Sequence, residues 1–168
     1  MFLILFEEKK MKITILNGEN RRQSNSLSAF LSDFTLESSR LENPVHIFNL
    51  SEMNLKFCTG CWSCWTKTPG VCSQQDNAEI IFKEVINSDL LIFASPIIAG
   101  FTSAELKKIT DRLIVLIHPY IQIRNNECHH QKRYEKYPNI GLILELGENT
   151  DEEDIQITTD IYKRLALN

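Results

Sequence analysis

Short apolar runs alternate along this chain with segments whose apolar residues recur at helical spacing, and this alternation limits the fold more than any other feature. The apolar runs lie at residues 12–16 (KITIL), 44–48 (PVHIF), 90–94 (LLIFA) and 140–146 (IGLILEL). Strands that alternate with helices in this way form a parallel sheet with right-handed crossovers and helices on both faces. The sequence therefore predicts an α/β, doubly wound fold.

The usual arrangement of this architecture also predicts the order of the strands. Five-stranded versions order their strands 2-1-3-4-5 and bind a ligand at the switch point between strands 1 and 3. We expect the order 2-1-3-4, with the run at 90–94 in the centre because it is apolar without alternation. A fifth strand is left open, with residues 2–6 or a partner chain as its two candidates. The polar segment 118–139 indicates a long connection.

Composition narrows the class of protein. The 168 residues can bury one complete core, so we expect a single domain over residues 11–168, preceded by an N-terminal extension at residues 1–10. A net charge of −4 gives no electrostatic reason to bind nucleic acid, and no apolar run approaches the ~20 residues of a membrane span. The five cysteines are an odd number and are clustered, unlike a secreted disulfide framework. We therefore expect a cytoplasmic protein.

The loop after the first predicted strand contains groups that suit an anion. It has the sequence GENRRQSNS (residues 18–26) and leads into a helix. A glycine, a guanidinium, hydroxyls and the first N–H groups of a helix can together bind phosphate. The same residues also suit an ordinary capped helix with solvated arginines, because Ser and Asn are common helix caps. The loop is neither a P-loop nor a GxGxxG turn.

The loop after the third predicted strand, SPIIAGF (residues 95–101), leaves the same edge of the sheet. Pro96 restricts the backbone, and Gly100 allows a flat ligand to approach backbone amides. Ser-Pro and Gly also punctuate ordinary strand-to-helix turns, so this loop by itself indicates little.

Three motifs, in this order along the chain, resemble those of the flavodoxin-like, NAD(P)H-dependent FMN reductases and their relatives, the iron–sulfur flavoproteins. NGENRRQSNS is similar to the phosphate loop of that family, CTGCWSC to its cysteine loop, and SPIIAGFTSAELKKITDR to its second flavin loop. The resemblance extends from residue 11 through the last predicted helix. It implies a flavodoxin-like fold, FMN as the cofactor, NAD(P)H as the electron donor and a homodimer.

The resemblance also implies which residues hold the flavin. Those expected at the phosphate are Gly18, Arg21, Ser24, Asn25 and Ser26. Those expected along the ribityl chain and the ring are Ser95, Pro96, Ile97, Ile98, Ala99 and Gly100. The chain departs from the family pattern at Glu19, where Ser is usual; this puts an anion near the phosphate unless the side chain turns outward. It also lacks an aromatic residue near Ile98, unless Trp62, Trp65 or Phe101 substitutes.

Four of the five cysteines gather in one short segment, as Cys58, Cys61, Cys64 and Cys72. The pattern C-x₂-C-x₂-C with a later Cys suits a [4Fe–4S] cluster, which needs converging thiolates and accepts its fourth ligand at a variable distance. A structural zinc would also accept four thiolates, although two pairs are its commoner pattern. The segment is also compatible with no metal, because Trp62 and Trp65 would make it an aromatic lid over a flavin or a dimer contact.

The resemblance implies an FMN-dependent oxidoreductase in which a nicotinamide reduces the flavin and the flavin passes electrons to a small-molecule or protein acceptor. This scheme demands no side-chain acid or base, so we predict no catalytic residue, and we expect Asp111 and Arg112 to form a helix-end ion pair. Two alternatives stay open. One is an electron-transfer module with flavin and a cluster, and the other is a non-enzymatic scaffold or sensor that binds zinc or responds to oxidants through its thiols.

Overall fold

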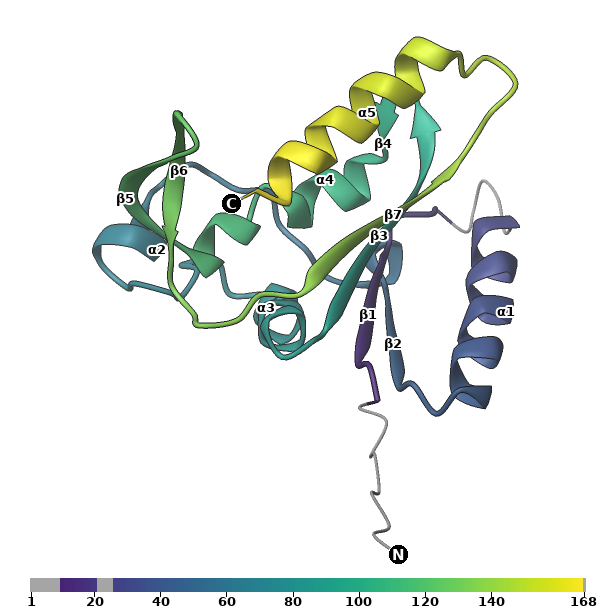
Figure 1. Ribbon diagram of the computed structural model, residues 1–168, viewed down its shortest axis with the longest axis horizontal. Helices are drawn as coiled ribbons and strands as arrows, with labels where there is room; N and C mark the ends of the chain where they lie inside the picture. The colour runs from purple at the N-terminus through teal and green to yellow at the C-terminus, as the bar shows by residue number, and fades with distance from the viewer. Residues whose placement is uncertain (1–9, 21–25, 168) are drawn as a thin grey trace, which may run out of the picture.

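The computed structural model describes residues 10–20 and 26–167, which form a parallel sheet with helices on both faces and a separate hairpin (Figure 1). The strands of the main sheet are β1 (Ile13–Asn17), β2 (Val45–Asn49), β3 (Leu90–Ile98), β4 (Phe101–Thr102) and β7 (Asn139–Glu145). The helices are α1 (Ser26–Arg40), α2 (Ser63–Thr66), α3 (Ala78–Ile86), α4 (Ala104–Thr110) and α5 (Glu152–Leu165), with the 3₁₀ turns η1 (Leu50–Glu52) and η2 (Leu113–Leu116).

The parallel strands lie in the order β2-β1-β3-β7, which confirms the predicted order 2-1-3-4 and the doubly wound, flavodoxin-like fold. Strand β3 is central, pairing with β1 on one side and with β7 on the other. Residues 2–6, one candidate for a fifth strand, lie outside the described residues. Within residues 10–20 and 26–167, no helix is long and apolar enough to cross a membrane.

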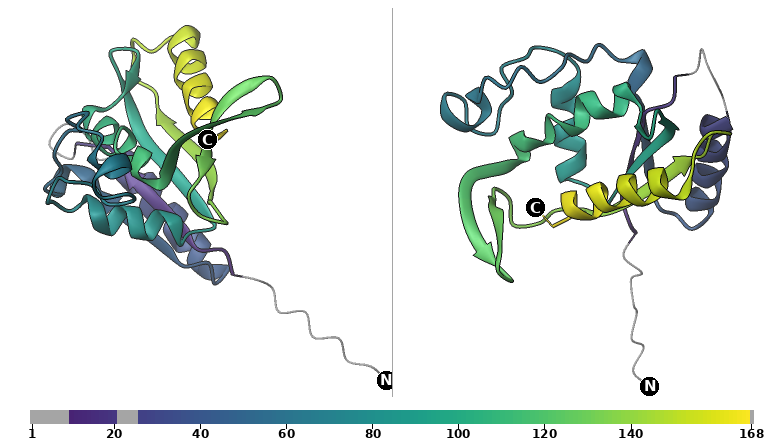
Figure 2. Two further views of the ribbon diagram at one scale, coloured as in Figure 1. Left: turned by 90° about the vertical axis from the view of Figure 1, so that its left-hand side faces the viewer. Right: turned by 90° about the horizontal axis from the view of Figure 1, so that it is seen from above.

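The two faces of the sheet bury separate apolar cores. Helix α1 covers one face and packs Leu27 against Ile92 and its neighbours. Helices α3, α4 and α5 cover the other face (Figure 2), where Ile81 and Tyr162 belong to the cluster around Phe93. The rings of Phe93 and Tyr162 lie 4.9 Å apart. Because successive strand residues point to opposite faces, the neighbours Ile92 and Phe93 serve the two cores.

The expectation of a long connection over residues 118–139 is wrong. Most of that segment is an antiparallel hairpin formed by β5 (Ile117–Arg124) and β6 (Glu127–Lys132), which projects from the body beside α2 (Figure 1). Its two-residue turn is Asn125-Asn126, with φ of 52° and 63°. Asn tolerates this left-handed conformation, which two-residue hairpin turns require. The polar composition concealed the hairpin because most of its side chains face solvent.

The segment expected as a loop at 95–101 is also largely strand. Strand β3 continues to Ile98, turns at Ala99 and Gly100, and returns as β4, with Ile98 paired to Phe101. The two turn residues have φ of 51° and 78°. Such a pair of left-handed residues makes a tight hairpin turn, and the glycine was the only sign of it in the sequence.

The loop after β1 packs against β3 and the start of α4. The N–H of Gly18 donates to the carbonyl of Ala94 at 2.8 Å, and the Ser103 hydroxyl donates to the carbonyl of Gly18 at 2.6 Å. Ser103 is the N-cap of α4, and its own N–H donates to the Ser95 hydroxyl. A Cβ on Gly18 would lie 2.6 Å from Ser103 Oγ and 2.7 Å from Leu106 Cβ. The site edge therefore depends on a glycine at this position.

We predict that Gly18→Ala lowers the free energy of unfolding by about 2–3 kcal/mol, because the added methyl group forces α4 away from the sheet edge. Urea unfolding followed by circular dichroism measures this change. The matched control is Gly147→Ala, whose added carbon would come no closer than 3.7 Å to another group, the Thr150 hydroxyl. We expect the control to stay within about 0.5 kcal/mol of the wild type. Equal stabilities of the two variants would contradict the prediction.

Candidate functional site

A buried polar network joins the carboxyl ends of β1 and β2 to the start of α1. The side-chain amide of Asn17 donates to Asn49 Oδ1 at 3.1 Å and to the Ser28 hydroxyl at 3.2 Å. Its carbonyl oxygen accepts from the N–H of Glu19 at 3.0 Å. One buried asparagine thus fixes the loop that follows β1 at the point where the switch-point crevice begins.

Glu19 turns its side chain inward onto helix α1, not outward. The side chain is buried, with 1% of the residue exposed. One carboxylate oxygen accepts from the N–H of Leu27 at 3.1 Å, and the other accepts from the N–H of Ser28 at 2.9 Å and from its hydroxyl. These amides belong to the first turn of α1, where N–H groups have no partner within the helix. Glu19 therefore occupies the first N–H donors of α1, which were expected to bind a phosphate.

The residues expected beside the flavin ring differ in their exposure to solvent. Ser95 and Ile97 are buried, and the Ser95 hydroxyl is used within the fold, since it accepts from Ser103 and donates to the Pro96 carbonyl. Ile98 is 47% exposed, and Ala99 beside it is exposed as well. A ligand at this edge would therefore meet the turn at 98–100, while Ser95 positions that turn.

The phosphate loop is described only in part. Gly18 lies at the sheet edge and Ser26 begins α1, but Arg21, Ser24 and Asn25 lie outside the described residues. At the expected ring end of the site, the Ile98 side chain is exposed. A flavin phosphate does not fit onto the amides of Leu27 and Ser28 while Glu19 holds them.

The four clustered cysteines line one pocket, which lies between the cysteine loop and η2. Cys64 is buried, Cys72 is half-buried, and Cys58 and Cys61 are exposed. Burial, followed by repulsion from the neighbouring thiolates of Cys72, Cys58 and Cys61, raises the pKa of Cys64. The thiols are therefore near enough to interact electrostatically, which the spacing in the sequence predicted.

Cys61 has the opposite shift. Hydrogen bonds from the Ser63 hydroxyl, the Ser73 hydroxyl and the Ser63 N–H lower the pKa of Cys61 to about 6. Its sulfur lies 3.2 Å from the Ser73 hydroxyl oxygen. A thiol with this pKa is largely thiolate at neutral pH, and the thiolate is the form that binds metals.

The arrangement of the cysteines bears on which metal could be held. Within residues 10–20 and 26–167, no three His, Cys, Asp or Glu side chains are grouped closely enough to hold one metal ion. A structural zinc needs four ligands around a single ion. An iron–sulfur cluster offers a separate iron to each thiolate, so its four ligands can converge on one pocket without meeting at one point. The described cysteines therefore do not form the single-ion site that a structural zinc requires.

A buried ion pair secures the cysteine loop to the end of α4. Arg112 and Asp76 have side chains 2% and 0% exposed, and two parallel contacts of 2.6 and 3.0 Å join them. The same guanidinium donates to the carbonyl of Lys56 at 3.1 Å and to the sulfur of Cys72 at 3.3 Å. Both ends of the cysteine loop are thus held by one arginine.

The expected pair between Asp111 and Arg112 is wrong. Asp111 instead pairs with Lys107, one turn earlier on the same helix, and Arg112 points into the cysteine loop. Sequence reasoning favoured adjacent residues because nothing local marks a partner that lies 36 positions away. The only sign of this partner in the sequence was an acidic residue, Asp76, shortly after Cys72.

Two tryptophans pack the cysteine loop against neighbouring elements. The indole N–H of Trp65 donates to the carbonyl of Ile114 at 2.9 Å, and its ring lies 5.0 Å from that of His130 in the hairpin. Trp62 lies 4.9 Å from Trp65 and is 53% exposed. Trp65 therefore anchors the loop within the fold, and Trp62 is the ring available to a partner or ligand.

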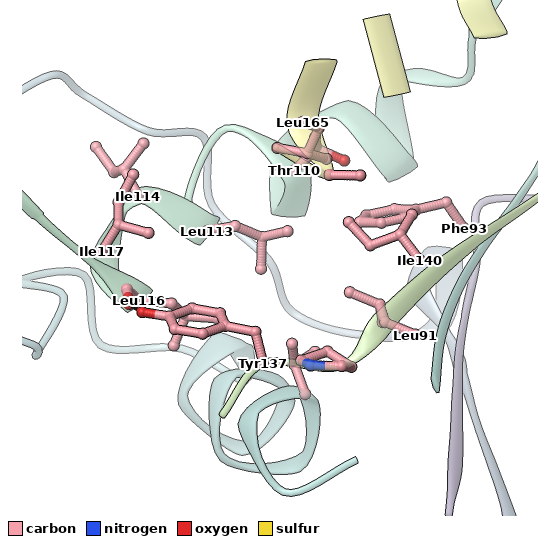
Figure 3. Close-up of a pocket in the computed structure, with 13 residues that line it drawn as sticks. Leu91, Phe93, Thr110, Leu113, Ile114, Leu116, Ile117, Tyr137, Ile140 and Leu165 are labelled. Atoms are coloured by element: carbon pink, nitrogen blue, oxygen red, sulfur yellow. Dashed lines mark hydrogen bonds between the residues drawn. The ribbon is translucent and has the colours of Figure 1, made fainter. Parts of the chain in front are cut away.

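An apolar pocket lies away from the switch-point edge, between β3, β7, α3, η2 and α5 (Figure 3). Leu91 and Ile140, which line it, stand near the amino ends of their strands, whereas ligands of this architecture bind at the carboxyl ends. No residue of the β1 or β3 turns lines it. We assign it no role in the site.

Comparison with known proteins identifies the family. The family model for NADPH-dependent FMN reductase matches residues 11–133, and the chain belongs to this family. An iron–sulfur flavoprotein of Clostridioides difficile is 34% identical over 110 residues, which cover 64% of this chain and 48% of that protein. An iron–sulfur flavoprotein of Archaeoglobus fulgidus is 32% identical over 111 residues, with 64% and 48% covered. The chain spans about half the length of these relatives.

Solved structures support the fold. An NAD(P)H:quinone oxidoreductase from Methanothermobacter marburgensis aligns over 94% of this chain and 74% of its own, with a TM-score of 0.64 and 16% identity. An azoreductase from Bacillus anthracis aligns over 93% and 79%, with a TM-score of 0.60 and 13% identity. At these identities the likeness concerns the fold alone.

We predict that the Asp76–Arg112 pair makes the free energy of unfolding fall as the solution becomes acidic. Burial raises the pKa of Asp76, but hydrogen bonds from Arg112 and from the N–H groups of Lys56 and Ala78 outweigh it, so the net pKa is lowered. A carboxyl whose folded pKa is lowered stabilises the fold above its unfolded pKa of about 3.9, and this stability is lost as the pH falls through the folded value. The free energy of unfolding should therefore fall below about pH 5.

The variant Asp76→Asn should lose about 3 kcal/mol at pH 7, because it leaves a buried guanidinium without its anion. It should also show a flatter decline in stability between about pH 5 and pH 2. Urea unfolding across that range measures both effects. The control is Asp111→Asn, which breaks only a surface pair and should cost less than about 1 kcal/mol. Identical pH profiles for Asp76→Asn and the wild type would refute the prediction.

Proposed function

We propose that this chain is the flavin-binding part of an FMN-dependent oxidoreductase, which takes electrons from NAD(P)H and passes them to a small-molecule or protein acceptor. The observation that carries the proposal is the packing of the loop after β1 against β3 and the start of α4, where Gly18 bonds to Ala94 and to Ser103. Membership of the FMN reductase family supports the same conclusion.

In this proposal the chain's own residues bind and orient the flavin. Gly18 allows the loop after β1 to approach α4, Ser95 fixes the base of the β3–β4 hairpin, and Ile98, Ala99 and Gly100 present its tip to the ring. The proposed site is completed by the half-buried Pro96, the buried Ile97 and the expected phosphate residues Arg21, Ser24, Asn25 and Ser26. The bound flavin would supply hydride and electron transfer, which is why the site needs no side-chain acid or base.

Three finer parts of the proposal concern the whole protein. Residues 11–168 form one flavin-binding domain, the protein acts as a homodimer, and it works in the cytoplasm. The five free cysteines support the cytoplasmic location, because a reducing compartment preserves thiols. The exposed ring of Trp62 supports the homodimer, because aromatic residues are enriched at protein interfaces.

We predict that the purified chain binds added FMN and that NADPH then bleaches the visible flavin absorbance under anaerobic conditions. Ile98→Glu should weaken flavin binding at least tenfold, because it places a charge where the ring approaches. The matched control is Ile123→Glu on the β5–β6 hairpin, at an isoleucine that is 79% exposed. Binding that is absent from the wild type, or equally weakened in both variants, would contradict the proposal.

A second candidate function is that of an iron–sulfur flavoprotein, which passes electrons between proteins through a cluster and a flavin. The lining of one pocket by Cys58, Cys61, Cys64 and Cys72 favours it, as do the relatives that are named iron–sulfur flavoproteins. In this reading the four thiolates bind a [4Fe–4S] cluster, which supplies one-electron transfer. Arg112 positions Cys72 for that role through its hydrogen bond to the sulfur.

We predict that anaerobic incubation with iron and sulfide loads about four irons per chain and produces a reducible spin-resonance signal. Cys72→Ser should lose most of the bound iron, whereas Cys128→Ser, on the hairpin outside the pocket, should retain it. Iron bound equally by both variants would rule out this ligand set. Stoichiometric zinc in the protein as purified would support the remaining alternative, a thiol-based scaffold or sensor.

A further inference from the structure

We propose that the apolar pocket between β3, β7, α3, η2 and α5 is a binding site for a small, uncharged, apolar molecule of the size of one substituted benzene ring (Figure 3). The pocket lies near the amino ends of β3 and β7, so it is separate from the edge at which we place the flavin. The inference therefore goes beyond the proposed function and does not depend on it.

The first argument is the chemistry of the walls. None of the 13 lining residues is charged, and all are apolar except Thr110 and Tyr137. The Thr110 hydroxyl donates to the carbonyl of Leu106 at 2.9 Å, and the Tyr137 hydroxyl donates to the carbonyl of Leu116. The Tyr137 hydroxyl also accepts from the N–H of Arg133 at 2.8 Å. Both polar groups are therefore already bonded within the protein.

The second argument is that the pocket suits water poorly. A water molecule inside a protein needs about two to four polar partners. In the part of the chain that the structure describes, the buried side-chain nitrogen and oxygen atoms without a hydrogen bond belong to Arg112, His129, Arg133 and Thr158, and none of these residues lines the pocket. An apolar molecule, in contrast, would gain both by leaving water and by its contacts with the walls.

The third argument is size. The pocket has a volume of about 130 Å³, whereas voids larger than a water molecule are few in protein interiors. An apolar cavity of about 150 Å³ is large enough to bind benzene. The buried lining residues Val85, Leu91, Phe93 and Leu116 belong to the cluster around Phe93, so the pocket continues into the core. Ala166, which also lines it, is exposed, so a ligand can enter at the end of α5.

The fourth argument is that contacts outside the pocket hold its walls in place. The indole N–H of Trp65 donates to the carbonyl of Ile114 in η2 at 2.9 Å. The guanidinium of Arg164, in the last turn of α5, contacts both carboxylate oxygens of Glu127 on the hairpin, at 2.8 and 3.0 Å. Both η2 and the end of α5 are thus joined to neighbouring elements. The pocket is therefore preformed, and a ligand does not have to order a loop before it binds.

The test compares toluene with benzoate, a charged probe of similar size. We expect toluene to bind saturably with a dissociation constant on the order of 1 mM or tighter. Benzoate should bind at least tenfold more weakly, because nothing in the walls can pair with or hydrate its carboxylate. Toluene at about five times its dissociation constant should raise the Tm by about 2–4 °C. NMR titration and thermal unfolding measure these effects.

A variant that fills the pocket locates the site. The Leu113 side chain points into the pocket (Figure 3), so Leu113→Trp should weaken toluene binding at least tenfold. The matched control is Leu36→Trp on α1, at a leucine that is 55% exposed and lies on the other face of the sheet, and it should change the affinity less than twofold. If Leu113→Trp does not fold, nuclear Overhauser contacts from toluene to the methyl groups of wild-type Leu113 and Ile140, and not to Ile123 on the hairpin, decide.

Four results would overturn the inference. They are the lack of saturable toluene binding, equal binding of toluene and benzoate, equal affinities in the two tryptophan variants, and toluene contacts that do not include Leu113 and Ile140. A wild-type dimer that Leu113→Trp dissociates would overturn it too, because a second copy of the chain would then cover the pocket. None of these measurements involves FMN, so each of these failures leaves the proposed function intact.

Discussion

The close contact between Gly18 and the N-terminus of α4 is the constraint on which the arrangement of the molecule depends. The loop after β1 is joined to the neighbouring strand β3 by a hydrogen bond from Gly18 to Ala94, and the Ser103 hydroxyl bonds to the Gly18 carbonyl. A side chain at Gly18 would not fit against Ser103 and Leu106. The edge at the carboxyl end of β1 is therefore fixed by backbone contacts with β3 and α4, and Glu19 follows directly from it.

Helix α4 connects this crevice to the thiol pocket. Its N-cap, Ser103, holds Gly18, and Arg112, just past its end, holds Asp76 and Cys72. The seven residues of the helix span about 10 Å at 1.5 Å per residue. A short helix anchored by the buried Leu106 and Ile109 thus fixes the expected flavin edge and the cysteine loop relative to each other, and a shift at one end would be transmitted to the other.

Most of the fold could be predicted from the sequence, because apolar periodicity reports burial directly: the four parallel strands follow from it, and their order follows from the usual arrangement of doubly wound sheets. The hairpin around Asn125 could not, since its strands have no continuous buried face and the turn signal was a pair of asparagines. The cysteine pocket was predictable from local spacing. The Arg112–Asp76 pair and the inward turn of Glu19 were not, because both depend on partners that only the packed structure brings together.

Strand β7 forms one border of the main sheet. Within the part of the chain that the structure describes, it bonds to β3 on one side and has no strand on the other. A free border of this kind offers a ready row of peptide groups to any extended segment. Two copies related by a twofold axis would meet there with opposite strand directions and would form one continuous sheet, whereas a parallel strand from the same chain would need a covering crossover. The direction of a strand that pairs with β7 would therefore distinguish a second copy of the chain from a further segment of it.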